Sequence, residues 1–342
     1  MQKWIFLGAA VSLAACGVAA QERLSKPCRA EVIKLCAVSR DRSAIAACLM
    51  EKQASLSTSC RSELRARIAG ADGRGGREAN LRSAALGGQE ISYGDHRKQN
   101  LDYYPAKNRA GKPAPLVIFI HGGGWSIGDK KTGTGTKAGF YNYLGFNFAS
   151  LNYRLVPEVK PDVQAGDIAK AIAYLRSRAT GLGFDPDQIY VMGHSAGAHL
   201  AALVSTDTRY LDAAGVPVSA LKGTILLDGA GYDVVAQMAY KGNLVQGMYD
   251  AAFGQDPATQ AALSPVTHVA APNATNWLIL HVDSRPDARK QSEALGNALT
   301  ANGANVSVLP VPNSSHSSVN KDAGTADTFT GDAIAKFLGQ HR

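Results

Sequence analysis

Most of this chain lacks cysteine, because all five cysteines lie within the first 60 of 342 residues. It also lacks long hydrophobic runs: the one candidate for membrane contact, residues 4–15, is too short to span a bilayer. Aromatic residues make up 7% of the chain, charged residues 19% and hydrophobic residues 45%. This composition excludes a disordered or membrane-spanning protein and predicts one large folded domain with an accessory piece.

The N-terminus predicts export. Lys3 precedes the apolar run 4–15, and the small residues Val18-Ala19-Ala20 before Gln21 fit a signal-peptide cleavage site, so residues 1–20 read as a signal peptide. Residues 13–16, Leu-Ala-Ala-Cys, also fit a lipobox, in which Cys16 carries the lipid and becomes the mature N-terminus. Both interpretations predict a periplasmic or extracellular protein, and the second predicts an outer-membrane lipoprotein attached through Cys16.

Four cysteines remain in residues 21–69, namely Cys28, Cys36, Cys48 and Cys60. An even number in an oxidising compartment predicts two disulfides. Residues 26–38 and 43–68 have helical patterns, and in an antiparallel helical hairpin Cys36 would face Cys48 and Cys28 would face Cys60, although three connectivities are formally open. Zinc is the competing interpretation, but the spacings are far from Cys-x2-Cys and no histidine intervenes. The stretch resembles the cysteine-rich repeat of the Golgi-apparatus-protein type.

Charge is distributed unevenly along the chain. Residues 21–82 hold 13 basic and 7 acidic side chains, a net of +6 out of a total of +8. The remainder is close to neutral, so the overall charge indicates little about the substrate, and no nucleic-acid-binding motif is present. We expect no nucleic-acid partner, and the sequence leaves the oligomeric state open.

The rest of the chain has the pattern of an α/β fold. Residues 70–88 are rich in glycine and polar residues and read as a flexible linker. Residues 89–104 predict a strand hairpin, and helical patterns at 162–178, 196–205, 287–302 and 325–339 alternate with short apolar runs. These runs are residues 116–120, 146–152, 189–192, 223–227, 277–282 and 306–311. Such alternation predicts a mostly parallel sheet with helices on both faces over residues 89–342. We find no internal repeat.

A nucleophile motif lies at the centre of this region. Gly193-His194-Ser195-Ala196-Gly197 follows an apolar strand and opens an Ala/Leu-rich helix. A serine on such a sharp strand-to-helix turn is strained and exposed, and glycines two positions away avoid a collision. The motif therefore predicts that Ser195 is a nucleophile, with the Ala196 N–H available to an oxyanion at the helix start.

A second motif predicts the rest of an oxyanion hole. His121-Gly122-Gly123-Gly124-Trp125 directly follows the strand at 116–120. Backbone N–H groups of Gly123 and Gly124 would join that of Ala196 in binding a tetrahedral oxyanion. The loop lacks the spacing of a phosphate-binding loop.

A serine nucleophile needs a base and an orienting acid. Among eight histidines, His316 follows the last core strand in a polar loop, at the sheet edge where open α/β sheets present functional groups. Asp283, the first residue after the strand 277–282, is the favoured acid; Asp287 and Asp228 remain alternatives. The predicted triad is Ser195, Asp283 and His316, with no metal or cofactor. Trp125, Tyr232 and Tyr249 are candidates for the pocket wall or for plain packing.

Residues 89–342 resemble α/β-hydrolase carboxylesterases of the hormone-sensitive-lipase-like and feruloyl-esterase-like group. The matching motifs include His121-Gly122-Gly123-Gly124-Trp125, Asn152-Tyr153-Arg154-Leu155, Asp185-Pro186, Gly193 to Leu200, Ser264-Pro265 and Gln291-Ser292. The resemblance implies a serine ester hydrolase for small or carbohydrate-linked esters. An arylformamidase-type amide hydrolase and a non-catalytic envelope binding module are the alternatives. One departure concerns the acid: the group usually has His-Gly-x-x-Asp where this chain has His281-Val282-Asp283-Ser284-Arg285.

Overall fold

We describe the protein from a computed structural model. The structure describes residues 25–36, 55–60, 63, 88–106, 113–239, 246–270 and 272–342. The chain divides into two compact units, Met1–Ile68 and Ala69–Arg342, which are described separately. This division falls just before the predicted linker.

The first unit contains helix α1 (Lys26–Cys36) and a disulfide between Cys28 and Cys60, whose Cα atoms lie 4.9 Å apart. Cys28 and Cys60 are buried with Val32 and Leu56 in a small apolar cluster. The predicted Cys28–Cys60 pairing is therefore confirmed, and it removes both residues as zinc ligands. The predicted Cys36–Cys48 bridge and most of the predicted second helix lie outside the described residues.

This unit corrects our statement that the chain has no internal repeat. The pattern Ser-x-x-Cys-Arg-x-Glu occurs at residues 25–31 and again at 57–63. Glu63 accepts hydrogen bonds from the backbone N and Oγ of Ser25, at 2.6 and 2.7 Å, and Glu31 does the same for Ser57, at 2.8 and 2.7 Å. Each glutamate, the last residue of one copy of the motif, thus accepts hydrogen bonds from the serine that begins the other copy. The motif is short, and only these crossed contacts make it visible.

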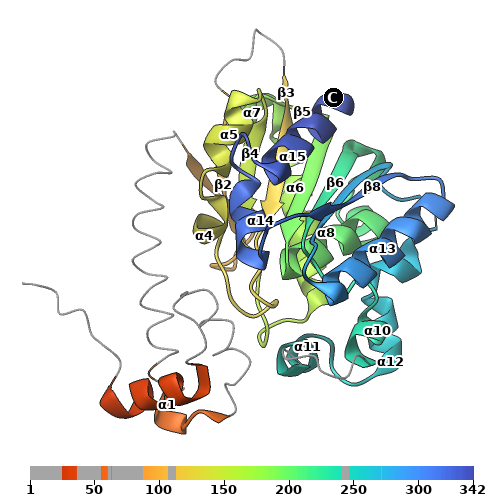
Figure 1. The fold of residues 1–342 in the computed structure, drawn as a ribbon. Coiled ribbons are helices and arrows are strands. Elements are labelled where there is room, and N and C mark those ends of the chain that lie inside the picture. The colour runs from red at the N-terminus through yellow and green to blue at the C-terminus, as the bar shows by residue number, and fades with distance from the viewer. Residues whose placement is uncertain are drawn as a thin grey trace, which may run out of the picture. The chain divides into compact units, whose positions relative to one another are not determined.

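An eight-stranded sheet organises the second unit (Figure 1). Its order is β1-β2-β4-β3-β5-β6-β7-β8, with β1 and β2 antiparallel and the strands from β4 onward parallel. The strands are β1 (Gln89–Ser92), β2 (Asn100–Tyr104), β3 (Ala114–Ile120), β4 (Asn147–Leu151), β5 (Phe184–His194), β6 (Leu221–Leu227), β7 (Asn276–Val282) and β8 (Asn305–Val311). Every predicted strand is present, and the predicted hairpin at 89–104 is the β1–β2 pair.

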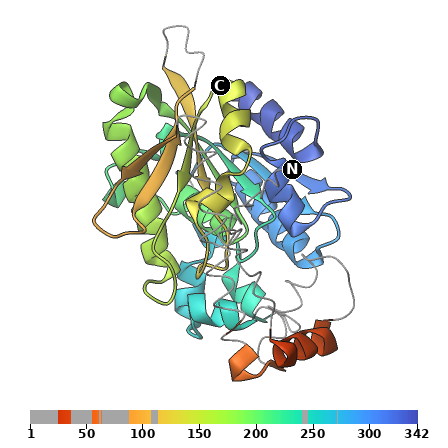
Figure 2. The same ribbon diagram turned by 90° about the vertical axis from the view of Figure 1, so that its left-hand side faces the viewer.

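Helices cover both faces of this sheet (Figure 2). Alternate residues of β3 point to opposite faces, as the two-residue period of a strand requires. Leu116, Ile118 and Ile120 join the core beneath α6 (Pro161–Ser177), α8 (Ala196–Thr206) and α13 (Pro286–Ala301). Val117 and Phe119 join the core beneath α5 (Lys137–Tyr143), α14 (His316–Asp322) and α15 (Phe329–Gln340). All five β3 side chains are fully buried, which explains why the strand reads as an unbroken apolar run.

Shorter helices lie in the connections, and the sequence patterns did not predict them. They are α4 (Lys130–Thr134), α7 (Ala179–Leu182), α9 (Arg209–Ala213), α10 (Val234–Ala239), α11 (Gln246–Phe253) and α12 (Pro257–Ala262). Most are one or two turns long, so they lack the repeated apolar spacing that identifies a longer helix. The predicted helix at 325–339 begins later, at Phe329, because Thr328 caps it by accepting a hydrogen bond from Gly331 N.

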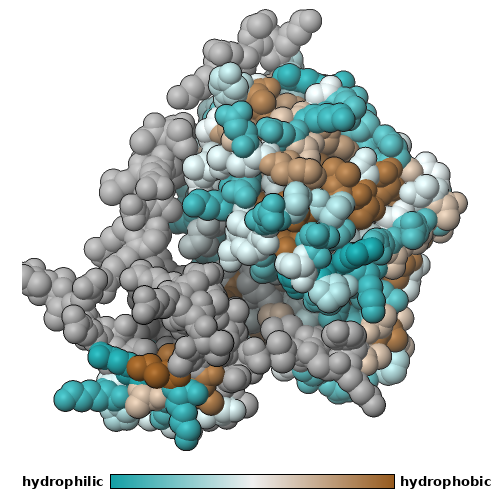
Figure 3. All heavy atoms as spheres, in the orientation of Figure 1, coloured by the Kyte–Doolittle hydropathy of each residue, from teal (hydrophilic) through white to brown (hydrophobic). Residues whose placement is uncertain are grey.

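The surface seen in Figure 3 is mostly hydrophilic, with hydrophobic atoms gathered in the region of β8. This strand is the last of the sheet and only partly buried along its length. Across the described segments, no helix combines the length and hydrophobicity needed to cross a membrane.

Candidate active site

Ser195 lies on the turn between β5 and α8, with backbone angles of φ 56° and ψ −122°. A positive φ is unusual for a residue with a side chain and marks a position that the surrounding structure holds under strain. The Ser195 N–H donates to Leu227 O at 3.0 Å, so neighbouring strand β6 fixes the turn. Ala196 opens α8, and its N–H therefore has no acceptor within the helix.

Close backbone approach explains both glycines of the motif. A Cβ on Gly193 would lie closer than 3.0 Å to the carbonyl group of Gly197, and a Cβ on Gly197 would lie that close to the carbonyl oxygens of Ile120 and His121. Neither glycine needs a positive φ. The start of α8 is thus pressed against the end of β3, which brings the Ser195 turn next to the glycine loop.

We expect Gly197→Ala to lower the free energy of unfolding by about 1–3 kcal/mol, because the new methyl group meets rigid backbone and overpacks the site. Gly166→Ala on α6 is the matched control, since a Cβ there has no heavy atom within 4 Å. A helical Gly→Ala change of this kind is neutral or stabilising. Thermal and denaturant unfolding of the two variants test this; equal stability of Gly197→Ala and wild type would contradict the close packing.

The glycine loop follows β3 as the sequence predicts. Gly123 and Gly124 have φ values of 117° and 57°, which side chains rarely tolerate. A Cβ on Gly122 would come within 2.9 Å of Ser195 Cβ, so the loop lies directly beside the nucleophile turn. Among the described residues, none accepts a hydrogen bond from the N–H of Gly123 or Gly124. These donors remain available to an oxyanion.

Trp125 anchors the far end of this loop. Its carbonyl oxygen accepts hydrogen bonds from Gln164 Nε2 at 2.7 Å and Val156 N at 2.9 Å, and its indole N–H donates to His199 Nδ1 at 3.2 Å. His199 in turn donates through Nε2 to Leu263 O at 2.8 Å. Burial lowers the pKa of His199 to about 4, so the imidazole stays neutral and keeps this arrangement. The anchoring holds the loop in place before any substrate binds.

The three aromatic candidates for the pocket wall are buried packing residues. Trp125, Tyr232 and Tyr249 are 2%, 1% and 4% exposed. Trp125 contacts Tyr249 and Phe253 edge to face, with ring centroids 5.2 and 4.7 Å apart. Met248 lies in the space a Cβ on Gly124 would need, so α11 covers the glycine loop. Trp125, Tyr249 and Phe253 therefore pack together and hold the end of the glycine loop in place.

His316 follows β8 as predicted, but it is the first residue of helix α14 and not part of the loop. Its carbonyl oxygen lies 2.8 Å from His194 Nε2, and the two rings are 4.5 Å apart at their centroids. These contacts join the start of α14 to the residue that precedes Ser195. Burial, followed by the proximity of His316, lowers the pKa of His194, which is consequently a neutral donor to this carbonyl.

The structure corrects the acid of the predicted triad. His316 Nδ1 lies 2.6 Å from Asp228 Oδ2, at the end of β6, and the Asp228 side chain is fully buried. Asp283, the favoured candidate, is solvent-exposed beyond β7, and its backbone N–H bonds Val311 O at 3.3 Å. Asp287 contacts Arg285 instead of the histidine. The structure thus pairs His316 with Asp228 and places His316 against His194, the residue before Ser195.

Counting along the end of β7 shows why the sequence favoured the wrong residue. In the spacing His-Gly-x-x-Asp that starts at His281, the position of the acid is occupied by Arg285. Its guanidinium forms an ion pair with Asp228. Asp228 has φ 44°, which turns its carboxylate under the end of β7, where Val282 N donates to Oδ1 at 2.9 Å. The usual position of the acid is thus occupied by an arginine, and the carboxylate comes from the end of the adjacent strand, β6.

Electrostatics keep Asp228 ionised. Burial alone would raise its pKa, but the hydrogen bond from His316 and the positive charge of Arg285 outweigh burial, and the pKa falls well below the usual range. The carboxylate is therefore charged throughout the pH range in which a serine hydrolase works. In the parts of the chain that the structure describes, no group of three or more His, Cys, Asp or Glu side chains is placed to hold a metal ion.

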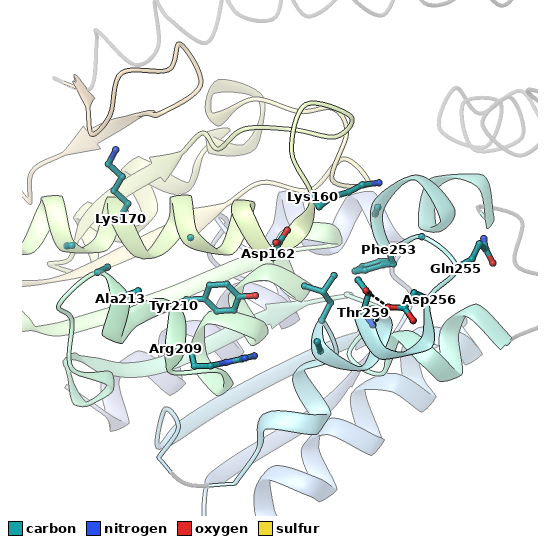
Figure 4. Close-up of a pocket in the computed structure, with 17 residues that line it drawn as sticks. Lys160, Asp162, Lys170, Arg209, Tyr210, Ala213, Phe253, Gln255, Asp256 and Thr259 are labelled. Carbon is teal, nitrogen blue, oxygen red and sulfur yellow. Dashed lines mark hydrogen bonds between the residues drawn. The ribbon is translucent and has the colours of Figure 1, made fainter.

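A groove of about 910 Å³ opens elsewhere, between α6, α9, α11 and α12 (Figure 4). Neither Ser195, Asp228 nor His316 lines it. Figure 4 shows Arg209 and Tyr210 on one side and Asp256 and Thr259 on another. Phe253 lines this groove and also packs against Trp125 at the end of the glycine loop, so this side chain lies between the groove and Trp125.

This parallel sheet, with a serine turn after β5, a glycine loop after β3 and a histidine after β8, defines an α/β-hydrolase fold. The family model BD-FAE matches residues 101–299. The chain belongs to the BD-FAE family.

Individual relatives agree with this assignment. The chain is 29% identical to esterase LipQ of Mycobacterium tuberculosis over 262 residues, which cover 73% of this chain and 61% of the relative. It is 25% identical to a kynurenine formamidase of Salmo salar over 73% of this chain and 81% of that protein. The crystal structure of esterase B from Lactobacillus Rhamnosis (HN001) superposes with a TM-score of 0.61 at 21% identity, covering 82% of this chain and 95% of the other.

Proposed function

We propose that this protein is a serine carboxylic-ester hydrolase that acts on small or carbohydrate-linked esters through an acyl-enzyme. The observation that carries the proposal is the assembly of Ser195, on its strained turn, beside a glycine loop and a histidine held by a buried carboxylate. The likeness to esterase LipQ supports ester hydrolysis, although the chain spans only 61% of that protein's length.

The geometry supports a defined division of roles. Because His316 Nδ1 faces Asp228, Nε2 is the ring nitrogen left to accept the Ser195 proton as the hydroxyl attacks an ester carbonyl. Asp228 holds the ring and stabilises its protonated form. The N–H groups of Gly123, Gly124 and Ala196 stabilise the oxyanion, and His316 returns the proton to the departing alcohol. Water, activated by the same histidine, then hydrolyses the acyl-enzyme.

A panel of p-nitrophenyl esters of graded acyl length, together with acetylated and feruloylated sugars, tests this function. We expect turnover of short esters at rates far above the background hydrolysis. Turnover of N-formylkynurenine tests the alternative activity, that of an arylformamidase-type amide hydrolase. The 25% identity to the Salmo salar kynurenine formamidase supports this alternative. Turnover of the formamide but no ester would favour that activity, and no turnover of either would favour a non-catalytic envelope binding module.

We also propose that the protein is exported, with residues 1–20 as a signal peptide or Cys16 as a lipid attachment site, and that residues 21–69 form a cysteine-rich module with two disulfides. The Cys28–Cys60 bridge in the described part of the first unit supports an oxidising compartment. Mass analysis of the mature N-terminus separates the two processing routes.

The N-terminal module is expected to be dispensable for chemistry, because Ser195, Asp228, His316 and the glycine loop all belong to the second unit. A chain that begins at Gly88 should remain soluble and hydrolyse p-nitrophenyl acetate within about twofold of the full chain. Thiol titration of the full exported protein should detect no free cysteine. Loss of turnover in a truncated chain that still unfolds cooperatively would show that the module contributes to the active site.

A further inference from the structure

Arg285 lies between the catalytic histidine and two carboxylates. It precedes α13, and its side chain is 30% exposed. One guanidinium nitrogen, Nη1, contacts Asp228 Oδ2 and lies 2.7 Å from His316 Nδ1. The other, Nη2, lies 3.2 Å from Asp287 Oδ2. A bidentate cation thus joins the buried acid of the site to a carboxylate on the first turn of α13.

Hydrogen-bond chemistry decides how these groups are arranged. A carboxylate oxygen 2.6 Å from His316 Nδ1 requires a hydrogen on that nitrogen, because ionised Asp228 can only accept. Arginine can only donate, so Nη1 and Nδ1 are two donors that converge on Asp228 Oδ2. Asp228 Oδ1 is occupied by Val282 N at 2.9 Å. Arg285 therefore competes with His316 for the same oxygen.

The positive charge of Arg285 and the negative charge of Asp228 have opposite effects on the protonation of His316. Asp228 favours a protonated imidazole, whereas a cation 2.7 Å away disfavours it. Three groups near this centre are uncharged at neutral pH, because burial lowers the pKa of His194 on β5 and raises the pKa values of Tyr232 and of Tyr249 on α11. Lys137 on α5 is more distant; burial lowers its pKa to about 7, so it remains partly charged at neutral pH. Asp287 is a further carboxylate near this centre, and it is paired with Arg285.

We propose that Arg285 is a positioning residue that extends the activity to lower pH: it holds Asp228 under β7 and opposes protonation of His316. The proposal rests on the proposed function, because it presupposes that His316 is the base for Ser195. The direction of the expected pH shift follows from the charge of Arg285. Removing the cation makes the imidazole easier to protonate, so the unprotonated base is lost at a higher pH.

The test is the pH profile of kcat/KM for p-nitrophenyl acetate, measured on the full chain. In Arg285→Gln the acid limb should move to higher pH by about 1 unit, the scale expected for a charge in direct contact. Arg285→Lys keeps the charge but cannot bridge both carboxylates, so its limb should stay near the wild-type position while kcat falls. Asp287→Asn leaves the guanidinium less neutralised, and its limb should move slightly to lower pH.

Arg289→Gln is the matched control, because Arg289 lies on α13, the helix that Arg285 precedes, is 56% exposed and pairs with Glu293 at 2.8 Å. Its profile should match that of wild type. A structural role alone would lower kcat in all Arg285 variants without moving the limb, and that result would overturn the proposal. So would shifts in the same direction for Arg285→Gln and Asp287→Asn. If Arg285→Gln fails to fold, the Asp287→Asn profile still decides, because a structural role alone would leave its limb at the wild-type position.

Failure of this inference is distinguishable from failure of the proposed function. Wild-type protein is first treated with a fluorophosphonate and the adduct is mapped. Labelling of Ser195 with an unmoved limb in Arg285→Gln overturns only the role of Arg285. Absence of labelling overturns the proposed nucleophile, on which this inference depends.

Discussion

Replacing Ser195 by alanine is expected to abolish ester hydrolysis, with kcat falling by about 10⁴ to 10⁶. The hydroxyl is the group that would form the acyl-enzyme, and no other side chain occupies the strained turn between β5 and α8. Removing it should leave the fold intact, because the turn is held by backbone contacts such as Ser195 N to Leu227 O. The measurement is initial rates on p-nitrophenyl acetate, with thermal unfolding to verify folding.

His316→Ala should cause a loss of similar size, because nucleophile and base act as a unit. Ser205→Ala is a control for the removal of a serine hydroxyl: Ser205 is buried at the far end of α8, the helix that Ser195 precedes, and its hydroxyl lies 2.8 Å from that of Thr224. That variant should lose stability but keep most of its turnover when folded. Retention of more than a few per cent of activity by Ser195→Ala would mean that the nucleophile is wrongly assigned.

Asp228→Asn is expected to lower kcat by about 10⁴, by analogy with other serine triads. The asparagine amide would present N–H groups or a neutral oxygen to His316 Nδ1, so it would no longer fix the tautomer in which Nε2 accepts a proton. It would also leave Arg285 beside the imidazole without its main counter-charge. Rates on p-nitrophenyl acetate at the pH optimum measure the effect.

Two neighbouring carboxylates supply the controls for this prediction. Asp283→Asn should change kcat less than threefold, because Asp283 is exposed and His316 contacts Asp228. Asp287→Asn should also have a small effect at the optimum, since Asp287 reaches the site only through Arg285. A 10⁴-fold loss in Asp283→Asn, with an active Asp228→Asn, would contradict the pairing seen here and restore the acid that the sequence favoured.

The spacing of apolar residues was sufficient to predict the sheet and its long helices, because the central strands are buried on both faces and each long helix is buried on one face. Leu116 to Ile120 is an apolar run for the first reason, and the apolar spacing of α6 arises for the second. The short helices around α9 to α12 carry too few residues to show a period. The contacts between Ser25 and Glu63, and between Ser57 and Glu31, depend on pairing across 38 and 26 residues, which no local pattern reports.

The candidate site was predictable where local backbone demands fix the residue type. Gly193, Ser195 and Gly197 form one turn whose geometry requires these residue types. The glycine loop after β3 was predictable for the same reason, because Gly123 and Gly124 have positive φ values. The acid was different. Any aspartate at the end of β6 or β7 reaches the same edge of the sheet, so the choice depends on which side chain turns inward. The burial of Asp228 at φ 44° and the ion pair between Asp228 and Arg285 decide it, and only the three-dimensional structure reveals both.

The most direct test of the central claim is to map the adduct of a fluorophosphonate on the intact protein by mass spectrometry, while following the labelling rate in wild type, Asp228→Asn and Asp283→Asn. We predict a single adduct on Ser195, formed at the same rate in wild type and Asp283→Asn and orders of magnitude more slowly in Asp228→Asn. An adduct on another residue, or rapid labelling of Asp228→Asn, would contradict the assignment of Ser195, His316 and Asp228 as the catalytic set.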